Sequence, residues 1–321
     1  MDATRVDDLL STFALDVAHG SVFVRNWSPP CGVRPRASVL VIHGIAEHSG
    51  RYDRLARFLS AKGMTVYALD LPGHGRSAQA GRLGNAGPEA WSDMTAAVTA
   101  LTRFVSRRHA DLPLFSFGHS MGSALNQWQI QNNGDLLEGA ILCGTFGALP
   151  DGLDEARMEQ MAALLAVADA ATRTAPSETM VHAVGGFTLP FVEAGKTPNG
   201  TEWQTQDPAE AQAFLDDPLC GFAFSNETTL SVVRGFSALW ADAAERRIPH
   251  DLPLLIVAGE NDPVGKKTAT IRELIGRYLG HGLTDVSCRF YPGQRHELLN
   301  EPRKDHTHRL IGHWIERVLD R

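Results

Sequence analysis

Gly118-His119-Ser120-Met121-Gly122 is the most informative stretch of this chain, because it stands between an apolar run, Leu114 to Phe117, and a helical pattern that begins at Met121. In a G-x-S-x-G pentapeptide a sharp turn lifts the serine hydroxyl above the end of a strand, and the glycines avoid clashes there. A glycine-rich surface turn would explain the pentapeptide but not its place between a strand and a helix. The context predicts that Ser120 is a nucleophile.

Short apolar runs predict strands over residues 37–42, 64–69, 113–117 (the run before the serine turn), 139–143, 254–258 and 286–291. They lack polar alternation, which is typical of strands buried on both faces. Helical patterns lie between them, at residues 51–62, 88–109, 121–131, 266–279 and 302–319. This alternation predicts an α/β fold, with a mostly parallel central sheet and helices on both faces. Residues 11–27 predict an antiparallel hairpin before it.

The alternation stops between residues 149 and 247, where a helical stretch at 153–172 is followed by a turn-rich segment with Pro190, Pro198-Asn199-Gly200, Pro208 and Pro218. We interpret residues 149–247 as an inserted cap, or lid, over the carboxyl edge of the sheet. The expected organisation is a first core part (1–148), the cap (149–247) and a second core part (248–321). Apolar residues recur at helical spacing in the cap, and either pack on the core or touch lipid aggregates: Met158, Met161, Leu164, Leu165 and Ala168.

A serine hydroxyl needs a base to take its proton, and the base needs an acid to orient it. In this topology the acid and then the histidine follow later strands. Asp262 and the alternative Glu260 come after the strand at 254–258, and His296 comes after the strand ending at Tyr291. We therefore expect Ser120, Asp262 and His296 to act together. Two groups of histidines compete with His296. One group precedes or adjoins the serine: His43, His48, His74 and His119. The other lies on the last helix and is expected to be solvated: His306, His308 and His313.

The tetrahedral intermediate of such a reaction needs two donors for its oxyanion. One is expected to be the backbone N–H of Met121, directly after the nucleophile. The other is expected in the loop after the first central strand, His43 to His48, where we assign it to the N–H of Ile45.

Composition excludes several partner classes. The 321 residues carry 30 Lys and Arg against 37 Asp and Glu, a net charge of −7, which is unlike a nucleic-acid-binding or anionic-membrane-binding chain. No apolar run reaches the roughly 18 residues of a membrane span, and the first eight residues do not resemble a secretory signal. Four widely spaced cysteines, Cys31, Cys143, Cys220 and Cys288, favour reduced thiols and a cytoplasmic location. The oligomeric state stays open.

Four motifs together carry a family resemblance: His43 to Tyr52, Asp70 to Ser77, Gly118 to Gly122, and Asp216 to Cys220. From about residue 35 to the C-terminus the chain resembles the monoacylglycerol lipase and lysophospholipase group of the α/β-hydrolase superfamily, of the serine aminopeptidase S33 type. The resemblance implies a serine ester hydrolase with a lid, acting on lipid-like monoesters, and it supports the triad and oxyanion assignments. The expected mechanism needs no metal or organic cofactor.

Two residues depart from the pattern of those lipases. Ile45 stands where they place small residues, and Phe214 stands where they carry a tyrosine that helps to hold the glycerol head. Glu47 and Arg51 are candidates for an alcohol-side pocket, with a structural ion pair as the alternative. The competing functions are a lysophospholipase, a carboxylesterase for short or aryl esters, and a catalytically silent binding protein on the same fold.

Overall fold

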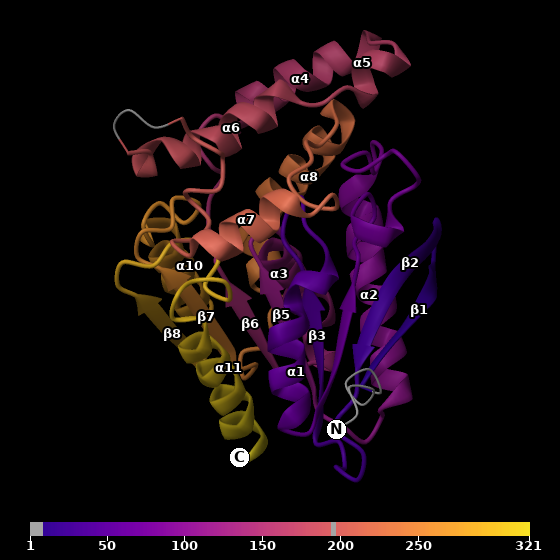
Figure 1. Ribbon diagram of the computed structural model, residues 1–321, viewed down its shortest axis with the longest axis vertical. Coiled ribbons are helices and arrows are strands. Elements are labelled where there is room, and N and C mark those ends of the chain that lie inside the picture. Colours follow the sequence, from indigo (N-terminus) through magenta and orange to yellow (C-terminus); the bar gives the residue numbers. More distant parts are fainter. Residues whose placement is uncertain (1–8, 194–196) are drawn as a thin grey trace.

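A computed structural model describes residues 9–193 and 197–321 of the chain. Its centre is an eight-stranded sheet of order β1-β2-β4-β3-β5-β6-β7-β8 (Figure 1). The first eight residues, considered above as a possible leader, lie outside the described part. The strands are β1 (Leu10–Val17), β2 (Gly20–Trp27), β3 (Ala37–Ile42), β4 (Met64–Leu69), β5 (Leu114–His119), β6 (Gly139–Cys143), β7 (Leu254–Gly259) and β8 (Val286–Tyr291).

The sheet is parallel from β4 through to β8, and the β1–β2 hairpin joins it antiparallel to β4. The predicted parallel sheet and N-terminal hairpin are therefore confirmed. Every residue of β3 to β7 is buried, as apolar runs between two helical layers require. The prediction of a doubly buried strand is wrong for β8, where Cys288 and Arg289 are exposed, because β8 is the edge strand and pairs with β7 on one side only.

Helices cover both faces of the sheet (Figure 1). Helices α1 (Asp53–Ala61) and α11 (Lys304–Leu319) pack on one face. Helices α2 (Ala90–Arg108), α3 (Met121–Asn133) and α10 (Ala269–Gly280) pack on the other. His306 and His313 on α11 are exposed as expected, but His308 is buried with its ring 6.0 Å from that of Phe58 on α1. The prediction that His308 is solvated is wrong, because it lies on the side of α11 that faces α1.

Within its described residues, the predicted cap segment contains six α-helices, of which α4 to α6 lie beyond one end of the sheet (Figure 1). Helix α8 packs between α4 and the core helices α2 and α3. The helix expected over 153–172 is interrupted at Ala168, after which Asp169 caps a new helix by accepting a hydrogen bond from the Thr172 N–H. The helices are α4 (Glu155–Val167), α5 (Ala170–Thr174), α6 (Glu178–Thr188), α7 (Pro208–Asp216), α8 (Asn226–Leu239) and α9 (Asp242–Glu245).

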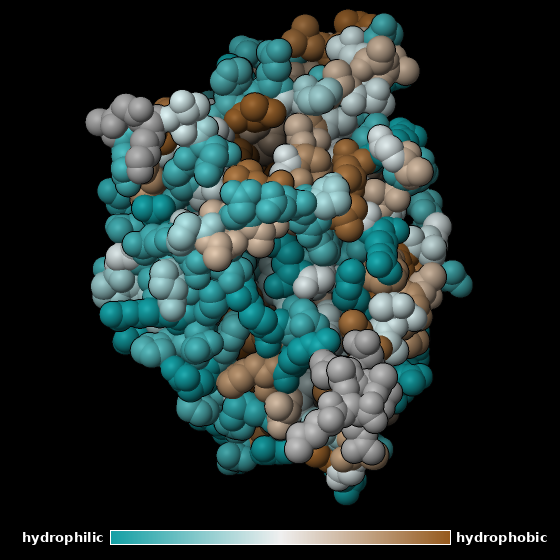
Figure 2. All heavy atoms as spheres, viewed as in Figure 1, coloured by the Kyte–Doolittle hydropathy of each residue, from teal (hydrophilic) through white to brown (hydrophobic). Residues whose placement is uncertain are grey.

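The part of the chain that the structure describes also has four short 3₁₀ helices: η1 (Ser49–Tyr52), η2 (Gly75–Ser77), η3 (Gly134–Leu136) and η4 (Leu189–Phe191). Within the described ranges, no helix has the length and hydropathy needed to traverse a bilayer. Apolar side chains are exposed over the upper part of the molecule, where Figure 1 places α4 to α6 (Figure 2). They include Leu164, Val167 and Leu189.

Candidate active site

Ser120 occupies the sharp turn between β5 and α3. Its backbone adopts φ 53° and ψ −121°, a left-handed conformation that costs free energy for a residue other than glycine. The flanking glycines are sterically required. A Cβ on Gly118 would lie 2.2 Å from the carbonyl oxygen of Gly122, and one on Gly122 would lie 2.1 Å from that of Ile42. The turn therefore holds Ser120 at the carboxyl end of β5, packed closely against β3.

Asp262 and His296 meet beyond the ends of β7 and β8. The Nδ1–H of His296 donates to Oδ2 of Asp262 at 2.8 Å, and Oδ1 of Asp262 accepts the Val264 N–H at 2.9 Å. Both side chains are buried, whereas Glu260 is exposed. The structure thus brings Asp262, and not Glu260, to the imidazole. With the proton on Nδ1, Nε2 is left to accept a proton, which is the tautomer that a general base requires.

The environment of His296 favours its charged form. Burial opposes protonation of the imidazole, but the charge and hydrogen bond of Asp262 outweigh it and raise the pKa of His296 above its ordinary value. Its Nε2 is buried and has no hydrogen-bond partner among the described residues. Because His296 and Ser120 line the same cavity, this nitrogen is available to a reacting group there.

The two expected oxyanion donors belong to the start of α3 and to the loop after β3. Met121 is the first residue of α3, so its amide has no acceptor within the helix and carries the positive end of the helix dipole. Ile45 lies in the loop after β3 and lines the cavity with Ser120. This loop runs close to the nucleophile, since a Cβ on Gly44 would lie 3.2 Å from Cβ of Ser120. The Gly44 N–H donates to Oε1 of Glu47 and so holds the loop.

Glu47 and Arg51 form a buried ion pair rather than a pair of free polar groups. Nη1 of Arg51 lies 2.6 Å from Oε2 of Glu47, and the same guanidinium binds both carboxylate oxygens of Glu297 at 2.9 and 2.7 Å. Burial raises the pKa of Glu47, but the charge of Arg51 and its other neighbours lower it to about 2. These contacts favour the structural alternative for both residues. Sequence reasoning missed Glu297, although it directly follows His296.

Phe214 lies beside this cluster, with the Arg51 guanidinium 4.9 Å from the centre of its ring. Phe214 and Glu47 both line the cavity that holds Ser120 and His296. The cavity has a volume of about 300 Å³, at the lower end of the range for small-molecule sites. Its walls are mostly apolar and come from the loop after β3, helix α6 and the segments around α7: Ile45, Met180, Val181, Val184, Phe214, Leu215, Phe222 and Phe224.

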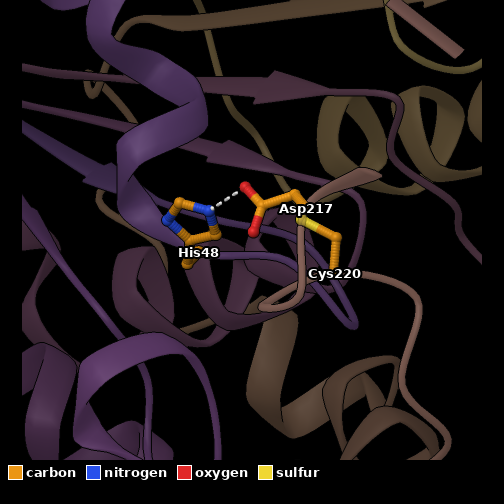
Figure 3. Close-up of side chains that lie close together, drawn as sticks. All are labelled: His48, Asp217 and Cys220. Atoms are coloured by element: carbon orange, nitrogen blue, oxygen red, sulfur yellow. Dashed lines mark hydrogen bonds and ion pairs between the residues drawn. The ribbon is translucent and has the colours of Figure 1, made fainter. Parts of the chain in front are cut away.

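A second cluster, His48, Asp217 and Cys220, joins the loop after β3 to the segment after α7 (Figure 3). The side-chain atoms that could bind a metal ion lie within 4.8 Å of one another, a spacing compatible with a metal site. Nδ1 of His48 accepts the Gly50 N–H at 3.1 Å, so Nε2 carries the ring proton and donates it to Asp217 at 2.8 Å. A metal on Nε2 would have to displace that proton, and burial raises the pKa of the Cys220 thiol. The cluster fits a hydrogen-bonded contact better than a metal site.

The strand order and the serine turn define an α/β-hydrolase, and comparison with known proteins agrees. Residues 33–303 match the family described as serine aminopeptidase, S33. This stretch is most of the chain, so the protein belongs to that family of hydrolases.

Individual relatives support a lipase or esterase function. The chain is 27% identical over 289 residues to a monoacylglycerol lipase of Mycolicibacterium smegmatis, covering 90% of each chain. It is 28% identical over 246 residues to the monoglyceride lipase of Mus musculus, covering 75% of this chain and 69% of that protein. Among solved structures, a thermostable carboxyl esterase from Bacillus coagulans in complex with glycerol superposes with a TM-score of 0.86 at 26% identity, covering 97% of this chain and 99% of that one.

Proposed function

We propose that the protein is a serine carboxylester hydrolase that cleaves lipid-like monoesters through an acyl-enzyme on Ser120. The observation that carries the proposal is the shared cavity: Ser120 and His296 both line one apolar cavity, and Asp262 binds the far side of the imidazole. The resemblance to monoacylglycerol lipases and to a carboxyl esterase supports the same reaction.

In the proposed mechanism, Oγ of Ser120 attacks the ester carbonyl carbon while Nε2 of His296 takes the hydroxyl proton. The N–H groups of Ile45 and Met121 hold the oxyanion of the tetrahedral intermediate. His296 then returns the proton to the leaving alcohol oxygen as the ester bond breaks. Water attacks the acyl-enzyme in the same way, giving up its proton to His296, and the acid is released with Ser120 restored. Asp262 stays ionised and orients the imidazole throughout.

The walls of the cavity support the proposed substrate class. Helix α6 and the segments around α7 supply the apolar side chains that an acyl chain requires. We propose that segment 149–247 acts as the cap of this cavity, and that its exposed Leu164, Val167 and Leu189 allow transient contact with lipid aggregates. The free thiols of the four cysteines support a reducing compartment, the cytoplasm.

A second candidate is an esterase for short or aryl esters. It is favoured by Phe214, whose ring has no hydroxyl to bind a glycerol head and instead stacks on Arg51. It is also favoured by the branched side chain of Ile45 in the cavity wall next to Ser120.

The test is a set of hydrolysis rates on one substrate panel, with Ser120→Ala as the blank. The panel holds a long-chain monoacylglycerol, a lysophospholipid, and aryl esters of short and medium chain. We expect the monoacylglycerol to be hydrolysed fastest. Dominant activity on short aryl esters with an inert glyceride would replace the lipid substrate with the second candidate. Rates equal to the Ser120→Ala blank on every ester would overturn ester hydrolysis itself.

A further inference from the structure

Two aromatic rings lie close to the imidazole of His296. The indole of Trp203, which comes from the cap segment shortly before α7, has its centre 4.9 Å from that of the imidazole, at an interplanar angle of 36°. The ring of His119, at the end of β5, lies at 4.8 Å and 45°. Trp203 is only 4% exposed, so its contact with the imidazole is shielded from solvent.

Hydrogen bonds fix Trp203 against the loop that carries His296. The backbone N–H of His296 donates to the carbonyl oxygen of Trp203 at 3.4 Å, and the N–H of Glu297 donates to that of Gln204 at 2.7 Å. The indole Nε1–H donates to the carbonyl oxygen of Gly200 at 3.0 Å. Phe187 packs on the indole as well, with ring centres 5.2 Å apart. The indole is therefore held in place before any substrate binds.

The two neighbouring rings differ in what they offer a positive charge. Burial and the nearby His296 lower the pKa of His119 to about 4, so the His119 ring is neutral near pH 7. An indole face attracts a cation within about 6 Å of its centre more strongly than other aromatic rings do. In the proposed reaction His296 becomes a cation each time it takes a proton, and Trp203 is already within that distance.

We propose that Trp203 is a positioning residue from the cap that stabilises the imidazolium form of His296 during the proton transfers. This inference rests on the proposed function and adds a residue to it. Several other charged or titratable groups influence the same imidazole: Asp262 after β7, His119 on β5, Glu47 in the loop after β3, and Glu297 beside His296. Arg51 on η1 pairs with both of these glutamates. All of them remain when only the indole is changed.

The test uses the full chain and a small phosphonate that reacts with the active serine but is too short to need the acyl cavity. Its rate of inactivation is measured as a function of pH for wild type, Trp203→Leu and Trp203→Phe. In Trp203→Leu we expect the high-pH rate to fall by about 2- to 30-fold, the range of a cation–π contact. The midpoint of the acid limb should move to lower pH, because the imidazolium has lost a stabilising contact. Trp203→Phe keeps an aromatic ring, so the midpoint should move in the same direction by a smaller amount.

Phe187→Leu is the matched control. It removes an aromatic ring from the same cluster, one that packs on Trp203, so the midpoint of the acid limb should stay in place. Thermal unfolding checks that each variant is folded; if Trp203→Leu is not, Trp203→Phe carries the test. A lower rate with an unmoved midpoint in every folded Trp203 variant would overturn the inference, because a purely structural loss acts equally at all pH values. If wild type itself does not react with the phosphonate, the proposed function fails as well.

Discussion

Asp262 and Glu260 follow the same strand two residues apart, but only Asp262 is buried and bound to His296. We predict that Asp262→Asn lowers kcat by about 10³- to 10⁴-fold, because an amide stabilises the wrong imidazole tautomer and no longer balances the imidazolium charge. Glu260→Gln is the matched control and should retain full activity. Steady-state kinetics on one ester measure kcat for both variants. A large loss of kcat in Glu260→Gln alone would assign the orienting role to Glu260 and not to Asp262.

The pH dependence follows from the raised pKa of His296. The base must be neutral, so kcat/KM should be constant at high pH and fall as the pH drops through a value above 6.5, the ordinary value for histidine. Asp262 contributes most to the raised pKa of His296, ahead of Glu297 and Glu47, so Asp262→Asn should move the midpoint to lower pH. A wild-type midpoint below 6.5 in the pH profile of kcat/KM would contradict this, because it would show that burial outweighs Asp262 in setting the pKa of His296.

At the scale of elements, the turn between β5 and α3 requires glycine on both sides of Ser120, and at Gly122 an added side chain would clash with a neighbouring strand. A Cβ at Gly122 would meet the backbone of β3 at 2.1 Å, which cannot relax without moving the strand. We predict that Gly122→Ala abolishes activity and lowers stability by at least about 1–3 kcal/mol, the usual cost of overpacking. Activity assays and denaturant unfolding measure both effects.

Gly276→Ala is the control for that substitution. Gly276 lies on the exposed side of α10, and a Cβ there meets nothing within 4 Å. Alanine should stabilise this helix by up to about 1 kcal/mol and leave activity unchanged. If the two variants lost similar activity, the tight packing of the serine turn would not be the cause.

How far the sequence predicts this molecule depends on the range of the interactions involved. The buried strands and the serine turn are local patterns, and the strand order of the fold brings Asp262 and His296 to the same edge. The partial exposure of β8 was missed, because edge position is a property of the whole sheet. Trp203 was missed because it sits in a turn-rich segment with no periodicity, and its contact with His296 spans 93 residues. The Arg51–Glu297 pair spans 246 residues and has no local signal.

At the scale of the whole molecule, Arg51 ties the loop after β3 to the loop after β8 through Glu47 and Glu297. Its guanidinium balances two buried carboxylates, so Arg51→Met would leave both without their counterion. We predict a loss of about 3–5 kcal/mol in the free energy of unfolding, measured by denaturant titration. Arg246→Met, which breaks the exposed pair with Asp242, should leave it unchanged. Equal stability of the two variants would contradict the role of this cluster.

The central claim is that Ser120 is the nucleophile that carries the acyl group. Its most direct test is mass spectrometry of the intact protein after reaction with a serine-directed phosphonate, followed by peptide mapping. We predict one adduct per chain on the peptide containing Ser120, formed slowly or not at all in His296→Ala and absent in Ser120→Ala. A folded wild-type protein that forms no adduct, or an adduct that persists in Ser120→Ala, would contradict the account.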